Sequence, residues 1–446
     1  MDLDAIFKAY DVRGLYPSQI DEEVAHRVGR ALVELTSSKK VIVAHDMRTS
    51  SEPLANAFIS GALTQGADVI DLGLAATDMA YFASGRLDAP AAIFTASHNP
   101  AEYNGIKLCR AGAVPVGEDT GLFDIKGMVA ANSFAGGKRP GSAERRDVMK
   151  DYVDHLVSLV DVSSFRELKV VVDTANGMGG LTVPAVFDRL PVRLVPMYFE
   201  LDGTFPNHPA DPIQPENLKD LVQRVEAERA DVGLAFDGDA DRVFLVDEKG
   251  EPVSGSLTAA LVARSILAKH PGEKVIYSIT SSRVVPETIR ETGGEPIRSR
   301  VGHSFIKAVM ASTGAIFGGE HSGHYYFRDH YRADCGLLAA LHVLEVLSVE
   351  RKPLSEVLAP LRRYWASGEI NSEVADKLGA IEAVAKRFAD GRVDRSDGLT
   401  VDYDDWWFNL RPSNTEPLLR LNVEARDQAV GEARRDEILG SIRGVG

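Results

Sequence analysis

Short apolar runs recur along the chain, and each is followed by a polar turn and an amphipathic stretch of helix length. Three of these runs are rich in β-branched residues and lie within residues 40–46, 169–177 and 274–280. Buried strands that alternate with helix-length segments are typical of βα units on parallel or mixed sheets. Because the runs are spaced by roughly a hundred residues, they predict three related α/β domains rather than a short-period solenoid. Chance resemblance between unrelated βα units is the alternative.

Turn-rich segments indicate where these domains begin and end. Residues 136–141 form a candidate linker, and residues 247–252 form a turn that closes the second domain. A different pattern begins near Trp365 and contains strand-like segments at residues 398–402, 406–410 and 419–425. The pattern therefore predicts four domains, at residues 1–145, 146–250, 251–364 and 365–446.

The composition is that of an ordinary globular protein of several domains. At 446 residues the chain exceeds what one hydrophobic core usually organises, and 44% hydrophobic with 26% charged residues is a typical balance. A formal net charge of −15 argues against nucleic-acid binding, which depends on clustered lysine and arginine. It does not exclude an anionic substrate, because a local pocket can be basic on an acidic surface.

Cysteine usage and apolar stretches bear on the compartment. Cys109 and Cys335 are the only cysteines and form no C-x-x-C pair, so we expect neither a disulfide scaffold nor a cysteine-rich zinc site. The first four residues lack the basic and apolar regions of a signal peptide. The longest apolar stretch, residues 336–347, contains a histidine and a glutamate and is too short to span a bilayer. We therefore expect a cytoplasmic protein with no membrane partner, and a buried helix at this stretch.

The first motif with chemical potential is Thr-Ala-Ser-His-Asn-Pro at residues 95–100, directly after an apolar run. A strand that ends in polar residues presents them at the sheet edge, where α/β proteins bind ligands. Ser97 is a candidate nucleophile, with His98 or a nearby base to manage its proton. A serine and asparagine turn made rigid by Pro100 is the alternative. Downstream, Lys107 is a candidate phosphate clamp or proton donor, or else a solvated surface charge.

The second motif is an acidic turn in which Asp237, Asp239 and Asp241 alternate before Arg242. Hard carboxylate oxygens on a compact loop suit Mg²⁺ or Ca²⁺, and bunched carboxylates repel one another without a cation. An EF-hand is excluded, because arginine stands where that loop needs glycine and because both flanks read as strands. A solvated acidic turn is the alternative. Arg242 is a candidate for stabilising charge on a transferring phosphoryl group.

Two further polar loops offer binding groups. Residues 318–324 combine glycines, which let a ligand approach the backbone, with donors and acceptors for sugar hydroxyls on Glu320, Ser322 and His324. Residues 411–417 offer an anion cradle that would be built from Arg411, Ser413, Asn414 and Thr415. A plain polar turn is the alternative for the first loop, and helix capping is the alternative for the second.

Taken in order along the chain, these four motifs and the opening segment at residues 7–14 resemble the α-D-phosphohexomutase family. The resemblance runs nearly the full length of the chain. It implies an α/β fold of four domains around a central cleft, in which three related α/β domains precede a smaller C-terminal α+β domain. It also implies an isomerase in which a phosphoserine gives its phosphoryl group to a sugar monophosphate, forming a bisphosphate that turns over in the cleft.

The resemblance assigns a role to each motif. Ser97 would carry the phosphoryl group, and Mg²⁺ would be held by Ser97, Asp237, Asp239 and Asp241. Sugar hydroxyls would be bound by Glu320, Ser322 and His324. The phosphate that is not transferred would be bound by Arg411, Ser413, Asn414 and Thr415. Charge stabilisation and acid–base chemistry would fall to Arg13, Lys107, Arg242 and His303.

The sugar loop resembles the phosphomannomutase and phosphomannomutase/phosphoglucomutase branch. We therefore expect interconversion of mannose 6-phosphate and mannose 1-phosphate by a monomer or weak dimer, with glucose phosphates as further substrates and hexose 1,6-bisphosphate as an activator. Phosphoglucomutase and phosphoglucosamine mutase are the alternatives within the family. A metal-dependent sugar phosphatase and a non-catalytic sugar-phosphate-binding protein are the alternatives outside it.

One segment departs from the family pattern. Many relatives carry a basic residue near the end of the third-domain strand, where this chain reads Ser-Ile-Thr-Ser-Ser-Arg at residues 278–283. The missing charge near Thr280 leaves the acid–base assignment there open, and Arg283 is the candidate replacement.

Overall fold

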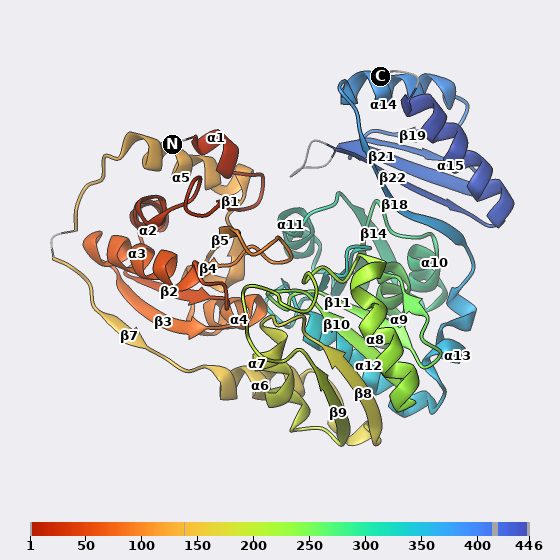
Figure 1. The fold of residues 1–446 in the computed structure, drawn as a ribbon, viewed down its shortest axis with the longest axis horizontal. Helices are drawn as coiled ribbons and strands as arrows, with labels where there is room; N and C mark the ends of the chain where they lie inside the picture. The colour runs from red at the N-terminus through yellow and green to blue at the C-terminus, as the bar shows by residue number, and fades with distance from the viewer. Residues whose placement is uncertain (1, 138, 413–417, 444–446) are drawn as a thin grey trace.

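The computed structural model describes residues 2–137, 139–412 and 418–443. The chain forms four sheets, and we refer to the four parts built on them as domains I to IV (Figure 1). Domain I holds a seven-stranded mixed sheet in the order β1-β5-β4-β2-β3-β7, with β6 paired to β5. Its elements are α1 (Leu3–Ile6), β1 (Val12–Leu15), α2 (Glu22–Thr36), β2 (Lys40–His45), α3 (Ser51–Thr64), β3 (Asp68–Leu74), α4 (Thr77–Leu87), β4 (Ala91–Phe94), β5 (Tyr103–Arg110), β6 (Val114–Pro115), α5 (Leu122–Ala131) and β7 (Ala143–Arg145).

Domains II and III each hold a five-stranded mixed sheet, in the orders β12-β11-β10-β8-β9 and β14-β13-β15-β16-β17. The elements of domain II are α6 (Met149–Ser158), β8 (Leu168–Asp173), α7 (Gly179–Phe187), β9 (Val192–Met197), α8 (Lys219–Glu228), β10 (Val232–Phe236), β11 (Val243–Asp247) and β12 (Pro252–Val253). Those of domain III are α9 (Gly255–Lys269), β13 (Lys274–Ser278), α10 (Val284–Glu291), β14 (Glu295–Ser299), α11 (His303–Thr313), β15 (Phe317–Gly319), β16 (Tyr325–Phe327), β17 (Ala333–Asp334), α12 (Gly336–Glu350) and α13 (Leu354–Leu358).

Domain IV is a five-stranded antiparallel sheet in the order β18-β22-β21-β20-β19. The strands predicted at its three apolar segments are confirmed. Its elements are β18 (Trp365–Glu373), α14 (Lys377–Arg387), β19 (Arg392–Asp394), β20 (Leu399–Asp402), β21 (Trp406–Pro412), β22 (Leu418–Ala425) and α15 (Gln428–Arg443).

One strand arrangement is repeated in domains I to III. In each, the first strand pairs in parallel with the second and the third, and the third pairs antiparallel with the fourth. The three β-branched runs of the sequence are the first strands of these units, β2, β8 and β13. Each has a buried centre and is followed by a turn and a helix, as apolar runs bounded by polar turns predict. The repeat is therefore confirmed, and its third and fourth strands form a hairpin in every copy.

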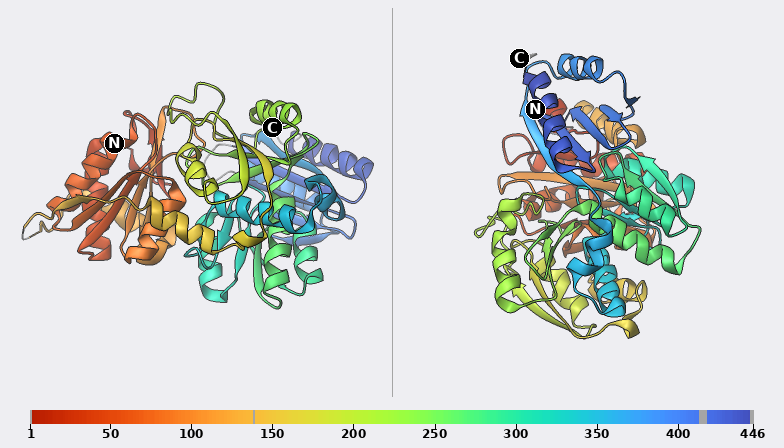
Figure 2. Two further views of the ribbon diagram at one scale, coloured as in Figure 1. Left: turned by 90° about the horizontal axis from the view of Figure 1, so that it is seen from below. Right: turned by 90° about the vertical axis from the view of Figure 1, so that its right-hand side faces the viewer.

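The buried apolar side chains show how the domains are joined. One cluster runs without a break from domain I through domains II and III, and it includes most of the predicted buried helix α12. Domain IV has a separate core between its sheet and its two helices. Figures 1 and 2 show domain IV (blue) at the far end of domain III from domain I. Domains I to III thus form one continuous body, to which domain IV is attached by the strand β18.

Within the described ranges, no helix combines the length and the apolarity that crossing a bilayer requires.

Candidate active site

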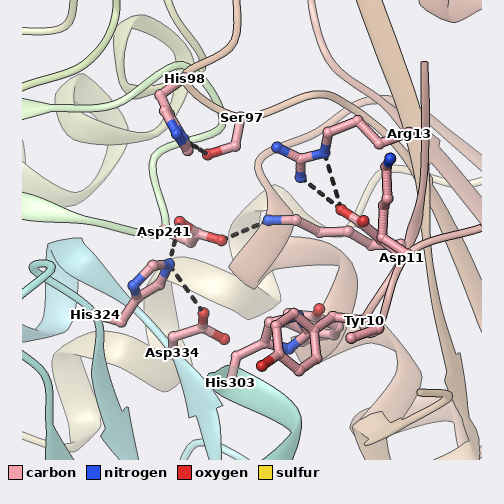
Figure 3. A pocket seen from close by; sticks show the side chains of 13 residues that line it. Tyr10, Asp11, Arg13, Ser97, His98, Asp241, His303, His324 and Asp334 are labelled. Carbon is pink, nitrogen blue, oxygen red and sulfur yellow. Dashed lines mark hydrogen bonds and ion pairs between the residues drawn. The ribbon is translucent and has the colours of Figure 1, made fainter. Parts of the chain in front are cut away.

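The hairpins that are equivalent in domains I, II and III carry the predicted motifs. Ser97 follows β4, residues 237–241 join β10 to β11, and residues 320–324 join β15 to β16. An antiparallel bridge pairs Arg242 with His324 and so ties the second hairpin to the third. Figure 3 shows side chains from all three hairpins around one pocket. Repetition of one strand arrangement therefore brings together three loops that are far apart in the sequence.

The loop of Ser97 is held in an uncommon backbone conformation. Ser97 has a φ of 51°, in the left-handed region that residues other than glycine seldom adopt. The fully buried guanidinium of Arg48, which is paired with Asp46 at 3.2 Å, supports this conformation. It donates hydrogen bonds to the backbone carbonyls of Ser97 (2.9 Å), Asn99 (2.6 Å), Pro100 (2.6 Å) and Tyr103 (3.0 Å).

Ser97 lies directly against the acidic loop. Its hydroxyl donates a hydrogen bond to Oδ2 of Asp237 at 2.7 Å, and its Oγ is 3.2 Å from Nδ1 of His98. The two loops approach so closely because residue 238 is glycine. A Cβ atom at Gly238 would lie 2.4 Å from the carbonyl oxygen of Ser97, where no side chain fits. The glycine of the Asp-Gly-Asp motif is thus needed for contact between the nucleophile and the acidic loop.

The three aspartates form a group that could hold a divalent cation. One carboxylate oxygen from each of Asp237, Asp239 and Asp241 lies within 4.8 Å of the others. Within the described part of the chain, Oδ1 of Asp239 and Oδ1 of Asp241 are buried without a hydrogen-bond partner. Lys107 donates to their Oδ2 atoms at 2.6 and 2.7 Å, and Arg242 Nε donates to Oδ2 of Asp237 at 2.9 Å. The side chains of Lys107 and Arg242 supply two positive charges against three carboxylates, which leaves room for a further cation. Because all of the available donors are carboxylate oxygens, they fit Mg²⁺.

Burial and charge shift the pKa values of this cluster. Burial raises the pKa values of Asp237 and Asp241, because an isolated carboxylate is poorly solvated there. Burial acts to lower the pKa of Lys107, but the two aspartates that it contacts outweigh this and hold its pKa well above the usual value. Burial also keeps the pKa of His98 well below its usual value. At neutral pH, Lys107 is therefore cationic and His98 is neutral.

A cavity of about 130 Å³ opens beside Ser97. Most of the predicted catalytic residues line it, namely Arg13, Ser97, Lys107 and His303, together with Asp241 and His324. The guanidinium of Arg13 donates to Asp11 Oδ2 at 2.5 Å and to Asn99 Oδ1 at 2.6 Å. Among the described residues, Nδ1 of His303 is buried with no hydrogen-bond partner, and burial keeps its pKa well below the usual value. His303 thus brings a neutral imidazole to the cavity.

The predicted sugar-binding loop lies beside this cavity, but Glu320 is already engaged. Its Oε1 accepts from the N–H of Gly302 at 3.1 Å, and its Oε2 accepts from the hydroxyl of Tyr326 at 2.6 Å. Ser322 Oγ is 3.0 Å from Nδ1 of His324, whose Nε2 lies 3.6 Å from Asp241 Oδ1. His324 therefore links the sugar loop to the acidic loop.

Two expectations about basic residues change. Arg411 was expected to open a loop, but it lies within β21, where its side chain is buried and contacts Glu369 at 3.3 Å rather than lining the cavity. Arg283 does not replace the missing charge near Thr280, because its guanidinium contacts Asp402 and the carbonyls of domain IV. The expected phosphate ligands Ser413, Asn414 and Thr415 lie outside the described residues.

Several residues around the site were not identified from the sequence. Thr77 Oγ1 donates to Asp239 Oδ2 at 2.6 Å, from the first turn of α4. Lys307 Nζ lies 2.7 Å from Asp334 Oδ1 and 3.8 Å from the ring centroid of Tyr81. Of these residues, Arg48 could have been found, because it follows the predicted strand β2 and polar residues at the end of such a strand lie at the sheet edge where ligands bind.

Comparison with known proteins agrees with this geometry. Four family descriptions match in order: phosphoglucomutase/phosphomannomutase α/β/α domain I at residues 4–135, domain II at 150–250, domain III at 254–364, and the C-terminal domain at 369–441. Among curated relatives, a protein described as phosphohexose mutases from Xanthomonas campestris pv. campestris is 41% identical over 98% of this chain and 99% of its own length. A phosphomannomutase from Salmonella montevideo is 41% identical over 97% of this chain and 98% of its own length.

A solved structure extends the comparison to the fold. The crystal structure of a phosphoglucomutase/phosphomannomutase family protein from Burkholderia thailandensis covers 100% of this chain and 98% of its own, with a TM-score of 0.91 and 34% sequence identity. This chain therefore belongs to the phosphoglucomutase/phosphomannomutase family, whose members are phosphohexose-isomerising enzymes.

Proposed function

We propose that the protein is a phosphomannomutase that interconverts mannose 6-phosphate and mannose 1-phosphate through a phosphoserine at Ser97, and that it also accepts glucose phosphates. The observation that carries the proposal is the position of Ser97, 2.7 Å from Asp237 and beside a cavity lined by Lys107, Arg13 and His303. Relatives named phosphomannomutase are 36–41% identical over nearly the whole chain. This supports mannose phosphates as the first substrates to test.

The residues of the cavity have distinct roles in this reaction. The bond between phosphorus and Ser97 Oγ breaks while a bond from phosphorus to a sugar hydroxyl oxygen forms, and the hydroxyl proton needs an acceptor. His303, whose ring lines the cavity, is the proposed acceptor of that proton. Arg13 and the cationic Lys107 offset the negative charge of the transferring phosphoryl group.

The acidic loop holds the site together. Asp237, Asp239 and Asp241, together with an oxygen on Ser97, would bind Mg²⁺, which when bound supplies positive charge that offsets the phosphate. Lys107 orients Asp239 and Asp241 through its two hydrogen bonds. Arg242 does the same for Asp237 and keeps its carboxylate facing Ser97. The loop thus needs both its cations and its glycine to present three carboxylates to one point.

The reaction has a second half in which the other phosphate of the bound hexose 1,6-bisphosphate returns to Ser97. Domain IV would hold the phosphate that is not being transferred, through the loop of Ser413, Asn414 and Thr415 and through Arg411, which would exchange its contact with Glu369 for the phosphate. Glu320, Ser322 and His324 would contact the sugar hydroxyls. A hexose 1,6-bisphosphate would phosphorylate a resting serine and would act as an activator. The protein is proposed to act as a cytoplasmic monomer or weak dimer.

The test is a coupled mutase assay on mannose 1-phosphate and glucose 1-phosphate, with and without a hexose 1,6-bisphosphate. Ser97→Ala and Asp239→Asn should each abolish turnover while circular dichroism stays unchanged, and Ser60→Ala, at an exposed site on α3, is a matched control. Full activity of Ser97→Ala would end the phosphoserine mechanism. Rapid release of phosphate from the phosphoenzyme without sugar would favour the sugar-phosphatase alternative instead. A higher kcat/KM for glucose 1-phosphate or for glucosamine phosphate would reassign the substrate.

A further inference from the structure

A second group of side chains of types that can bind a metal lies outside the cavity, where three domains meet. Asp78 is in the first turn of α4, whereas His330 and Cys335 lie in the segment between β16 and α12. One ligand atom from each of the three lies within 4.8 Å of the others, and all three residues are almost fully buried. Cys335 Sγ is 2.8 Å from Asp78 Oδ2. An aspartate, a histidine and a cysteine from distant parts of the chain therefore point at one buried position.

His330 gives independent evidence that this position receives a ligand. The residue has 0% exposure, and within the described ranges both of its ring nitrogens are buried with no hydrogen-bond partner. A buried polar group without a partner costs about 1–3 kcal/mol, so such groups are rare unless something binds them. Both ring nitrogens of His330 are therefore available to a metal ion at this position.

The surroundings supply fixed orientation and further donors. The hydroxyl of Tyr152, from α6 of domain II, donates to Asp78 Oδ2 at 2.6 Å. The N–H of Leu338 donates to Cys335 Sγ at 3.2 Å and holds the sulfur at the start of α12.

The donor set selects the class of metal. Cysteine and histidine with one carboxylate suit Zn²⁺ far better than Mg²⁺, which prefers oxygen ligands alone. One thiolate and one carboxylate balance the two positive charges of Zn²⁺, which suits a position without water. On binding, the sulfur–hydrogen bond of Cys335 is replaced by a sulfur–metal bond, and its proton leaves to solvent. No oxidant or reductant takes part.

We propose that Asp78, His330 and Cys335 form a structural zinc site that fastens domain I to domain III, beside helix α6 of domain II. The site is separate from the proposed function, because none of the three residues lines the cavity beside Ser97 among those described there. The ligands are not an adjacent cysteine pair, so no spacing motif in the sequence announces the site. Asp78 follows Thr77, whose hydroxyl contacts Asp239, so the zinc site also steadies one support of the acidic loop.

The test uses cobalt as a coloured replacement for zinc. The full-length protein is produced in medium that contains Co²⁺ and is purified with excess Mg²⁺, which keeps cobalt from the acidic loop. Absorption from thiolate-to-cobalt charge transfer reports a cysteine ligand, and metal analysis gives the stoichiometry. We expect roughly one tightly held cobalt per chain together with this absorption. Both should persist in Cys109→Ser, because Cys109 is the other buried cysteine and lies outside the group.

Cys335→Ser and His330→Gln decide the assignment. Both should lose the charge-transfer band and the tightly held metal, and zinc should raise the melting temperature of the wild type but not of His330→Gln. If Cys335→Ser does not fold, His330→Gln gives the answer alone, because glutamine is polar and smaller than histidine. No thiolate band in the wild type, or a band that survives in His330→Gln, would overturn the proposal. Mutase activity is not the readout, so failure of either proposal leaves the other intact.

Discussion

The most direct test of how this site is built is to add a single methyl group at residue 238, in the variant Gly238→Ala. A Cβ there would lie 2.4 Å from the carbonyl oxygen of Ser97, about 1 Å nearer than ordinary van der Waals contact allows. Arg48 anchors the serine loop from its other side, so the strain falls on the contact between the loops. The 2.7 Å hydrogen bond from Ser97 to Asp237 would then lengthen beyond hydrogen-bonding range. A displacement of this size at reacting groups typically costs about 100-fold in rate, or about 2.7 kcal/mol of transition-state stabilisation.

The experiment compares Gly238→Ala with Gly127→Ala. Gly127 lies in α5, and no described atom would lie within 4 Å of its added Cβ, so that variant should keep full activity and stability. We expect Gly238→Ala to lose about 100-fold in kcat/KM in the coupled assay while its melting temperature falls only slightly. Phosphorylation of Ser97 by a hexose 1,6-bisphosphate should slow in parallel. Activity within threefold of the wild type would refute the claim that this glycine sets the distance between the loops.

Three further substitutions probe the supports of the site. Arg48→Lys removes the fork that binds four carbonyls and should lower kcat/KM at least ~10-fold, and a fully active variant would contradict this role. Arg283→Ala unfastens domain IV and should raise KM several-fold with less effect on kcat, whereas an unchanged KM would argue against it. For Glu345, burial acts to raise the pKa, but the His342 imidazole 3.7 Å away and the hydrogen bond from Lys269 outweigh it and lower the pKa to about 2. Its contribution to stability is therefore present above pH 4.5, the ordinary value, and is lost as the pH falls toward 2. Glu345→Gln should destabilise the protein by about 1 kcal/mol in urea unfolding at pH 7 and by less at pH 3, and an equal loss at both would disprove the assignment.

The apolar pattern predicted the fold well because each domain is built from local units. The runs that became β2, β8 and β13 are strongly β-branched and are bounded by turns, so their type and extent followed from residues close in sequence. The hairpin around the acidic loop was also predictable, since two apolar strands flank a short polar turn. Domain limits are less determined by local pattern. The second sheet takes in β12 (Pro252–Val253), although the turn before it reads as a boundary.

The site was predictable only where a motif concentrates chemistry in a few residues. Ser97 and the three aspartates could be identified because their residue types and spacing already point to phosphate and metal chemistry. Arg48, Thr77 and Lys307 act through contacts with residues far from them in the sequence, which leave no periodicity and no motif. The sequence also could not indicate that the guanidinium of Arg283 turns toward domain IV. Its partners there become neighbours only once domains III and IV pack together.

The division of cores explains why the fourth domain differs from the other three. Domains I to III share one apolar core, and their three equivalent hairpins must keep the serine, acidic and sugar loops within ångströms of one another. Domain IV has a core of its own and is held to domain III largely by polar contacts such as those of Arg283. A bound bisphosphate that reorients between the two half-reactions must be released by the residues of domain IV that bind its second phosphate, yet it must stay inside the cleft. Polar contacts between domains break at lower cost than a shared apolar core, so a separately folded fourth domain can release the phosphate while the reacting loops keep their positions.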